Sequence, residues 1–206
     1  MRKLPFLTIA ALALFLTGCS EQPSPATPEK KAEEKPEPIT GQSALFKMYQ
    51  VARSWAPDAA VLKMTSEHLS DVPDQPGKAG AWDATFVSAQ RSSARAYTWS
   101  AIEIQPSLHK GVFAGAESSY TPGSGPTKNF LIGAVKIDTD AALATAKTKA
   151  VDYDKKNPGK PITFLLEQDP KFANPQWRVI WGESLGISNF SILIDAITGT
   201  FLETMH

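Results

Sequence analysis

Ile39-Thr-Gly-Gln-Ser-Ala-Leu45 and Ile137-Asp-Thr-Asp-Ala-Ala-Leu143 align without a gap, 98 positions apart, and each precedes an apolar pattern of helical spacing. Residues that can cap a helix lie in both stretches: Ser43 in the first, and Thr139 or Asp140 in the second. Both stretches therefore predict the start of a helix. The positions predicted to face a core are Leu45, Met48, Tyr49, Ala52 and Trp55 in the first helix, and Leu143, Ala146, Ala150 and Tyr153 in the second.

Strand-like segments follow each predicted helix in the same order. They cover residues 61–69, 82–86 and 94–104 in the first half, and 162–167, 177–181, 190–196 and 200–204 in the second. The sequence thus predicts an α+β fold made of two tandem αβββ(β) repeats, residues 39–114 and 131–206. Each repeat is expected to be an antiparallel sheet with one helix packed on one face. Chance similarity between two short α+β patterns is the alternative interpretation.

Residues 115–130 separate the two predicted repeats and are rich in Gly, Ser and Pro. This composition predicts a flexible linker. An ordered loop that contributes to a site is the alternative.

Alternation along the strands sorts their residues onto two faces of the sheet. Large apolar side chains share one parity and are expected to pack against the helices: Trp82, Phe86, Tyr97, Trp99, Trp177, Trp181, Ile192 and Ile194. The opposite face is the candidate interface, with Thr85, Thr98, Ser100, Arg178, Ile180 and Leu193 as its candidate residues. An ordinary solvated sheet face is the alternative.

The second half carries a short motif of a known family. Trp177-Arg-Val-Ile-Trp181, and later Asp195-Ala-Ile-Thr-Gly199 before a last strand, resemble the PepSY domain over about seventy residues. The resemblance implies a small secreted or membrane-attached module without chemistry of its own, linked with regulating or inhibiting peptidases or with binding in the cell envelope. The first half departs from the motif, because Glu103-Ile-Gln-Pro-Ser-Leu-His109 stands where the turn should fall.

The Asp-Ala-x-Thr-Gly motif also has a purely structural explanation. Gly199 can adopt the positive φ of a tight turn, and Asp195 and Thr198 can accept hydrogen bonds from turn amides. We therefore expect a structural turn at Asp195, Thr198 and Gly199. A ligand or catalytic role for Asp195 is the alternative.

The N-terminal residues resemble a targeting signal. Arg2 and Lys3 precede an apolar stretch, residues 4–16, that is too short to cross a bilayer, as in a signal peptide. Leu16-Thr-Gly-Cys19 resembles the lipobox of bacterial lipoproteins. The resemblance implies removal of residues 1–18 and an acylated (palmitate-bearing) Cys19, and Ser20 after it fits sorting to the outer membrane, facing the periplasm, if the cell has two membranes. An ordinary secretory cleavage site is the alternative.

Residues 19–38 contain five prolines, five glutamates and three lysines, a composition that cannot bury enough apolar surface to fold. They are expected to be a disordered tether between the lipid and the folded part. We therefore expect this segment to act only as a spacer.

Composition excludes several classes of function. Lys and Arg number 21, as do Asp and Glu, so no basic excess indicates a nucleic-acid partner. Cys19 is the only cysteine, which leaves neither a disulfide nor a thiolate zinc site within the chain. The three histidines, His68, His109 and His206, lack metal-ligand spacing. The sequence therefore predicts no catalytic, cofactor or metal residues, and no enzyme.

Together these patterns predict a lipid-anchored protein of the cell envelope that binds a protein or peptide through its sheet face, with regulation or inhibition of an envelope enzyme as one role. One alternative is an envelope hydrolase with His68 or His109 beside a carboxylate and a hydroxyl. Another is a carrier of a small apolar ligand, with a cavity lined by Trp82, Trp177 and Trp181.

Overall fold

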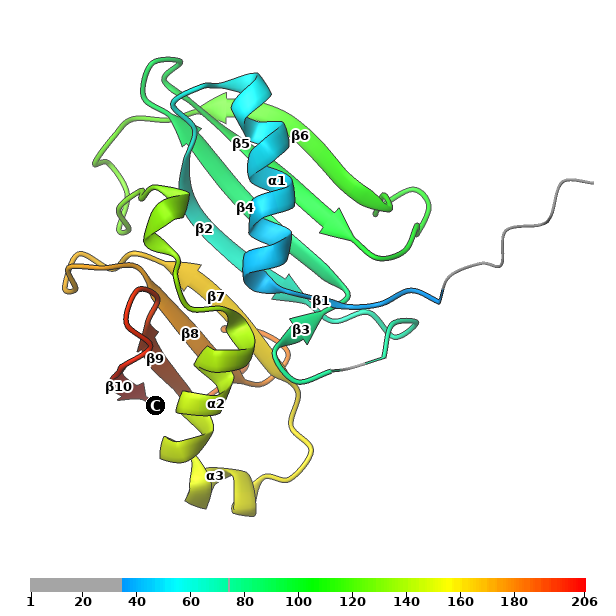
Figure 1. Ribbon diagram of the computed structural model, residues 1–206, viewed down its shortest axis with the longest axis vertical. Helices are drawn as coiled ribbons and strands as arrows, with labels where there is room; N and C mark the ends of the chain where they lie inside the picture. Colours follow the sequence, from blue (N-terminus) through cyan, green and yellow to red (C-terminus); the bar gives the residue numbers. More distant parts are fainter. Residues whose placement is uncertain (1–34, 74) are drawn as a thin grey trace, which may run out of the picture. The chain divides into compact units, whose positions relative to one another are not determined.

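Eight antiparallel strands form one sheet in the order β10-β9-β8-β7-β2-β4-β5-β6 (Figure 1). The structure is a computed structural model that describes residues 35–73 and 75–206. The strands are β2 (Ala60–Glu67), β4 (Ala81–Ser88), β5 (Ser93–Ser100), β6 (Gly111–Ser119), β7 (Ile162–Glu167), β8 (Gln176–Trp181), β9 (Ser191–Asp195) and β10 (Phe201–Met205). The fold is therefore α+β with a large antiparallel sheet, in agreement with the predicted class.

The two longer helices lie on the same face of the sheet, which faces the viewer in Figure 1. α1 (Gly41–Trp55) contacts β4, β5 and β6, whereas α2 (Thr139–Lys149) contacts β8 and β9. The remaining elements are short: β1 (Ile39–Thr40) and β3 (Lys78–Ala79), which pair with each other, the 3-10 helix η1 (Ile132–Ala134), and α3 (Val151–Lys156). Among the described residues, no helix is long and apolar enough to span a bilayer.

The centre of the sheet is the pairing of β2 with β7, which we call the seam. It consists of three residue pairs, Lys63 with Glu167, Met64 with Leu166 and Thr65 with Leu165. Beyond Thr65 the hydroxyl of Ser66 replaces the backbone ladder by accepting a hydrogen bond from the Phe164 N–H at 2.9 Å. From the seam outward, each half of the sheet follows chain order, β2-β4-β5-β6 on one side and β7-β8-β9-β10 on the other.

Aromatic side chains between the sheet and the helices form the centre of the core. Trp82 and Trp177 are fully buried with ring centroids 6.4 Å apart, and Phe164 packs against both. Each indole N–H donates to the carbonyl just before a helix region, Trp82 to Ile39 at 3.1 Å and Trp177 to Ile137 at 2.8 Å. All eight residues predicted to face the helices are buried, which confirms that part of the prediction.

The N-termini of α1 and α2 are bonded to each other. The Gly41 N–H donates to the Thr139 hydroxyl at 2.9 Å, and the Gln42 N–H donates to the Asp138 carboxylate at 2.8 Å. The Thr139 hydroxyl, which is fully buried, in turn donates to the carbonyl of Gly77. Helix-start amides have no partner within their own helix, and here the second half supplies the partners for the first.

This arrangement corrects the predicted caps. Thr40, which makes no side-chain cap bond, is the N-cap residue of α1, and not Ser43. Asp138 caps α2 by accepting from the Thr139 N–H at 2.7 Å, whereas Thr139 and Asp140 lie inside the helix. The reason is that the acceptors for α1 come from a segment about a hundred residues away, which local patterns do not reveal.

Element boundaries differ from the prediction at two further places. β6 continues to Ser119, so the predicted flexible linker begins inside a strand. Its Gly, Ala and Ser residues have low strand propensity, but backbone pairing with β5 holds them. The second predicted helix is interrupted at Ala150, where α2 ends and α3 begins. The predictions for residues 1–34, including the signal peptide, Cys19 and most of the tether, lie outside the described residues.

Candidate functional site

The sheet face away from the helices is accessible in the first half. Cross-strand pairing places Thr65, Asp83, Thr98 and Phe113 in one row across β2, β4, β5 and β6. Asp83 and Phe113 are exposed, and the Thr98 hydroxyl donates to the Asp83 carboxylate at 2.6 Å. The next row, Lys63 and Thr85, is likewise open to solvent or half-buried. Small polar side chains thus leave this part of the sheet free to contact another molecule.

All six predicted interface residues belong to this face, but only half of them can be reached. Thr85, Thr98 and Arg178 are half-buried. Ser100, Ile180 and Leu193 are buried, with exposed fractions of 1, 1 and 7%. The prediction that these three contact a partner is therefore wrong for the folded chain.

The second half of the face is covered by its own side chains and loops. The Arg178 guanidinium lies over β9 and donates to the Ser191 hydroxyl at 2.8 Å. The loop after β8 is held by Ser188, whose hydroxyl bonds to the carbonyls of Trp181 and Phe190 at 2.8 and 3.0 Å. Parity along a strand tells which face a residue occupies, but it does not tell whether a loop covers that face.

A pocket of about 290 Å³ opens where the accessible and the covered parts meet. We call it the sheet-face pocket, and its lining residues are Lys63, Thr65, Ser66, Glu67, Thr163, Leu165, Glu167, Ile180, Glu183, Ser184 and Leu185. Three of these residues are glutamates and one is a lysine, so the lining has an excess of carboxylates. Such a pocket attracts a positively charged group.

The surroundings of this pocket raise the pKa of two of its carboxyl groups, those of Glu67 and Glu167. Loss of hydration raises the pKa of Glu67, and the nearby Asp83 carboxylate adds to the increase. Loss of hydration also raises the pKa of Glu167, although Arg178 and Lys63 oppose the effect. Burial lowers the pKa of the Arg178 guanidinium, which Glu167 opposes. A cation close to either glutamate would relieve the cost of keeping that carboxylate ionised.

Sequence reasoning missed Lys63, Glu67 and Glu167. The signal was present, because Lys63, Thr65 and Glu67 alternate with buried residues along β2. The sequence did not predict that β2 pairs with β7, and this pairing places Glu167 opposite Lys63.

Asp195 and its turn have a local structural use. One carboxylate oxygen accepts from the N–H groups of Ile197 and Thr198, both at 2.8 Å, and the other accepts from Asn174 at 2.9 Å. Gly199 has a φ of +75° and its N–H donates to the Asp195 carbonyl at 2.9 Å. Burial alone would raise the pKa of Asp195, but the hydrogen bonds from Asn174 and the two amides lower it overall.

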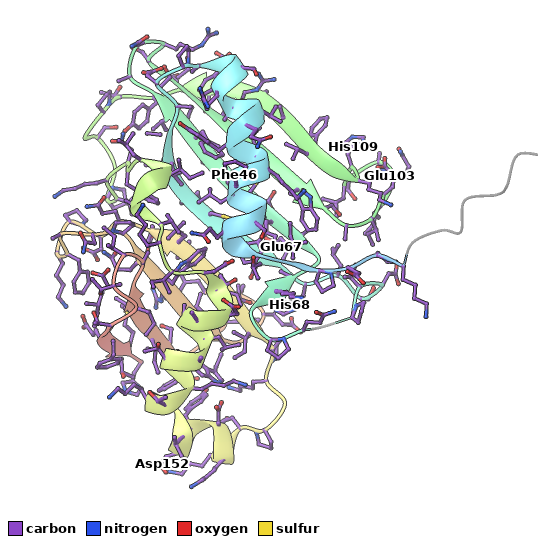
Figure 2. All side chains as sticks on the ribbon, in the orientation of Figure 1. Phe46, Glu67, His68, Glu103, His109 and Asp152 are labelled. Atoms are coloured by element: carbon purple, nitrogen blue, oxygen red, sulfur yellow. The ribbon has the colours of Figure 1, made fainter. Side chains whose placement is uncertain are left out.

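His68 and His109, the two histidines of the hydrolase alternative, lie in separate parts of the structure (Figure 2). His68 Nε2 lies 3.4 Å from the Thr163 hydroxyl, which itself donates to the Gly182 carbonyl at 2.7 Å. That proton is therefore not positioned for transfer to His68. His109 Nδ1 lies 3.0 Å from Glu103 at the surface, far from His68 in Figure 2. Among the described residues, no group of His, Cys, Asp and Glu could hold a metal ion.

Glu103 orders the loop between β5 and β6. It accepts hydrogen bonds from the Lys110 N–H, from Gln105 and from His109, and these bonds, led by the one from Lys110, lower the pKa of Glu103. The His109 ring also packs on Phe113 with centroids 4.5 Å apart. These contacts account for the pair as a loop support.

The cavity expected of an apolar carrier is not formed by the residues predicted for it. Trp82, Trp177 and Trp181 have exposed fractions of at most 1% and pack on neighbouring aromatic rings. Close packing leaves no room for a ligand among them.

Comparisons with known proteins add little to this geometry. No protein family model and no curated protein matches the chain. A crystal structure from Clostridium difficile 630, of a protein described provisionally as a lipoprotein, is similar with a TM-score of 0.44 and 10% sequence identity. The similarity covers 78% of this chain and 91% of that one.

Proposed function

We propose that this protein is a lipid-anchored, non-catalytic binding module of the cell envelope, built from two tandem αββββ units. The observation that carries the proposal is the accessible sheet face of the first half together with the carboxylate-rich pocket at its inner edge. The partner is a protein or peptide that lies on this face and places a positively charged side chain in the sheet-face pocket, beside Glu67 or Glu167.

Equivalent contacts in the two halves support the tandem units. Ile39 and Ile137 correspond in the sequence match, and each accepts a hydrogen bond from the first tryptophan of the second long strand in its half. Gly41 and Thr139 also correspond, and they bond to each other. Paired positions meeting in this way are expected when two copies of one unit join around a two-fold axis.

The anchor rests on the sequence alone. Arg2, Lys3, the apolar stretch and Leu16-Thr-Gly-Cys19 support acylation of Cys19, and Ser20 supports placement in an outer membrane that faces the periplasm. Residues 19–38 would hold the folded part away from the lipid surface. Replacing Cys19 with Ala should abolish incorporation of labelled palmitate and release the protein from the membrane fraction. Unchanged labelling would exclude the anchor.

The absence of catalysis is a proposal supported by the side-chain geometry. Glu103 and His109 lie at the surface in a loop, and the Thr163 hydroxyl is bonded to a carbonyl. The Asp195 carboxylate is bonded to two amides of its own turn and to the side chain of Asn174. These groups have structural partners in place of reactive ones.

Photocrosslinking in living cells tests the binding face. A photoreactive residue at position 85 or 98 should capture the same partner, whereas one at Thr148, exposed on α2, should not. Glu67→Lys with Glu167→Lys should remove the adduct, because the pocket would then repel a cation. Asp152→Lys, a single charge reversal on exposed α3 (Figure 2), should leave the adduct intact. Equal capture from position 148, or an adduct that survives the double reversal, would refute the proposal.

A further inference from the structure

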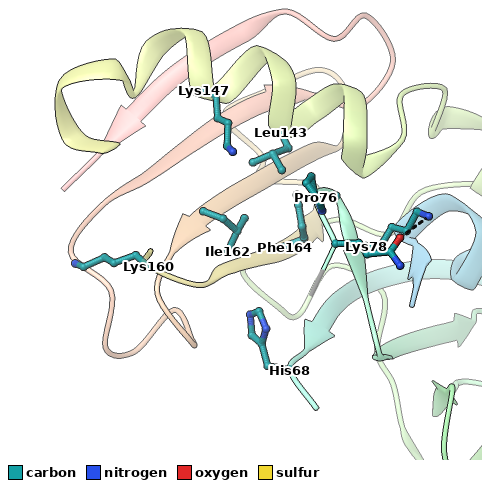
Figure 3. Close-up of a pocket in the computed structure, with 10 residues that line it drawn as sticks. His68, Pro76, Lys78, Leu143, Lys147, Lys160, Ile162 and Phe164 are labelled. Carbon is teal, nitrogen blue, oxygen red and sulfur yellow. Dashed lines mark hydrogen bonds between the residues drawn. The ribbon is translucent and has the colours of Figure 1, made fainter. Parts of the chain in front are cut away.

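A second cavity, of about 210 Å³, lies on the helix side of the seam (Figure 3). Both halves of the chain line it: His68, Gln75, Pro76, Gly77 and Lys78 from the first, and Leu143, Lys147, Lys160, Ile162 and Phe164 from the second. We call it the lysine pocket. It is separate from the sheet-face pocket, which lies on the other face of the same sheet.

The charge of this cavity is opposite to that of the sheet-face pocket. Three of its lining residues are lysines, and none of the lining residues within 35–73 and 75–206 is an Asp or a Glu. Lys78 donates to the Gln75 side chain and Lys160 to the Tyr153 hydroxyl, both at 2.9 Å and both to neutral groups. Lys147 extends over the cavity in Figure 3 and makes no hydrogen bond or ion pair within residues 35–73 and 75–206. Its ammonium group is therefore available to an anion.

The floor of the cavity is apolar. Ile162 is half-buried and supplies the accessible apolar surface, whereas Leu143 and Phe164 are almost fully covered, with exposed fractions of 4 and 1%. Leu143 and Lys147 are four residues apart on α2, which places the apolar floor and the ammonium group on one side of the helix. A ligand that fits both would have an apolar body and one anionic end.

The volume limits the size of such a ligand. Pockets for drug-sized molecules measure roughly 300–1,000 Å³, so about 210 Å³ suits a smaller compound. Lys78 and Lys160 already donate to neutral side chains, which leaves Lys147 as the lining lysine without a bond to another described residue. One such ammonium group matches a single carboxylate better than a phosphate, which needs several donors.

We propose that the lysine pocket binds a small organic carboxylate with an apolar body, held by Lys147 at its charged end and by Ile162 along its apolar body. This site does not depend on the proposed sheet-face partner, because its residues come from the other side of the sheet.

Titration of the purified protein followed by amide NMR shifts tests the site with three probes. 3-Phenylpropionate should shift the amides of Lys147 and Ile162 in a saturable way. 3-Phenylpropylamine, which has the same body with a positive end, and acetate, which lacks the body, should bind at least about tenfold more weakly. Equal binding of the amine would refute the charge argument, and equal binding of acetate would refute the apolar floor.

Paired lysine variants locate the binding. Lys147→Met keeps the apolar stem and removes the charge, and should weaken 3-phenylpropionate binding about tenfold. Lys149→Met removes a charge from the same last turn of α2, but Lys149 lies over the Phe201 ring and should leave the affinity unchanged within about twofold. Equal effects of the two variants, or no saturable shift with unchanged thermal stability, would overturn the proposal.

Discussion

The two halves of the sheet have the same order of elements, but the face away from the helices is open in one half and closed in the other. In the first half this face carries exposed Lys63 and Asp83 and half-buried threonines. In the second half the corresponding region carries buried Leu165, Ile180 and Leu193. The same order of helix and strands can therefore give an accessible sheet face in one half and a covered, apolar one in the other.

The helical segments of the two halves also differ. α1 is one helix of 15 residues, whereas the second half divides its helical segment into α2, with 11 residues, and α3, with 6. The cavity on the helix side lies beside α2, whose last turn supplies Lys147. The first half is thus distinguished by its accessible face away from the helices, and the second half by the cavity beside α2 on the helix side.

The largest expected effect tests whether the halves share one core. Trp82→Ala and Trp177→Ala should each lower the free energy of unfolding by about 3–5 kcal/mol, because each removes a fully buried indole and its hydrogen bond. Calorimetry should show a single transition for both variants, since the two rings pack together. Two separate transitions would mean that the halves fold independently, and half-buried Trp55→Ala serves as the milder control.

The bond between the helix starts is expected to come next. Thr139→Val keeps the shape of the side chain but leaves the Gly41 N–H and the Gly77 carbonyl without their partner. We expect a loss of about 1–3 kcal/mol in urea unfolding. Exposed Thr148→Val should change stability by less than about 0.5 kcal/mol. A similar small effect at Thr139 would show that the two helix starts do not depend on each other.

The seam offers a smaller effect. Ser66→Ala removes the acceptor of the Phe164 N–H at the end of the β2 and β7 pairing and should cost about 1 kcal/mol. Ser70→Ala, on an exposed loop residue, should be neutral. Faster hydrogen exchange at Phe164 in the Ser66 variant would confirm that the hydroxyl closes the seam, and unchanged exchange would contradict it.

The smallest effects concern two carboxyl groups with opposite pH behaviour. The pKa of Asp195 lies below its ordinary 3.8, so its contribution to stability is present above that value and is lost as pH falls through the folded pKa. The pKa of Glu167 lies above its ordinary 4.5, so ionisation costs stability above the folded pKa, and protonation relieves that cost as pH falls toward 4.5.

Urea unfolding at several pH values separates the two groups. Asp195→Asn should destabilise the protein at pH 7, with a difference that shrinks in acid, whereas Glu167→Gln should stabilise it at pH 7, with a difference that vanishes below 4.5. The same sign for both variants would refute the contrast between turn and pocket.

Local patterns predicted the interior well. Helical spacing identified Leu45, Met48 and Ala52, which are all fully buried, and strand alternation identified the buried tryptophans. Both signals come from burial on one side of an element, and such burial leaves a period in the sequence. The helix caps were not predicted, because their partners are side chains from the other half.

The candidate site could be predicted only in part. Parity placed Thr85, Thr98 and Arg178 on the sheet face away from the helices, as the structure has them. The pocket needs β2 beside β7, and no local pattern encodes that pairing. The burial of Ile180 and Leu193 was also not predictable, because the covering segments are irregular and have no period to read.

The hydrogen bond between Gly41 and Thr139 joins positions 98 residues apart, which affects the order in which the molecule can mature during synthesis. A ribosome makes the N-terminal helix long before it makes the threonine that this helix needs. Until Thr139 has been synthesised, the N–H group of Gly41 can bond only to water or to another temporary partner. The nascent protein therefore completes its structure late, which would suit the place in the cell envelope that we propose for it.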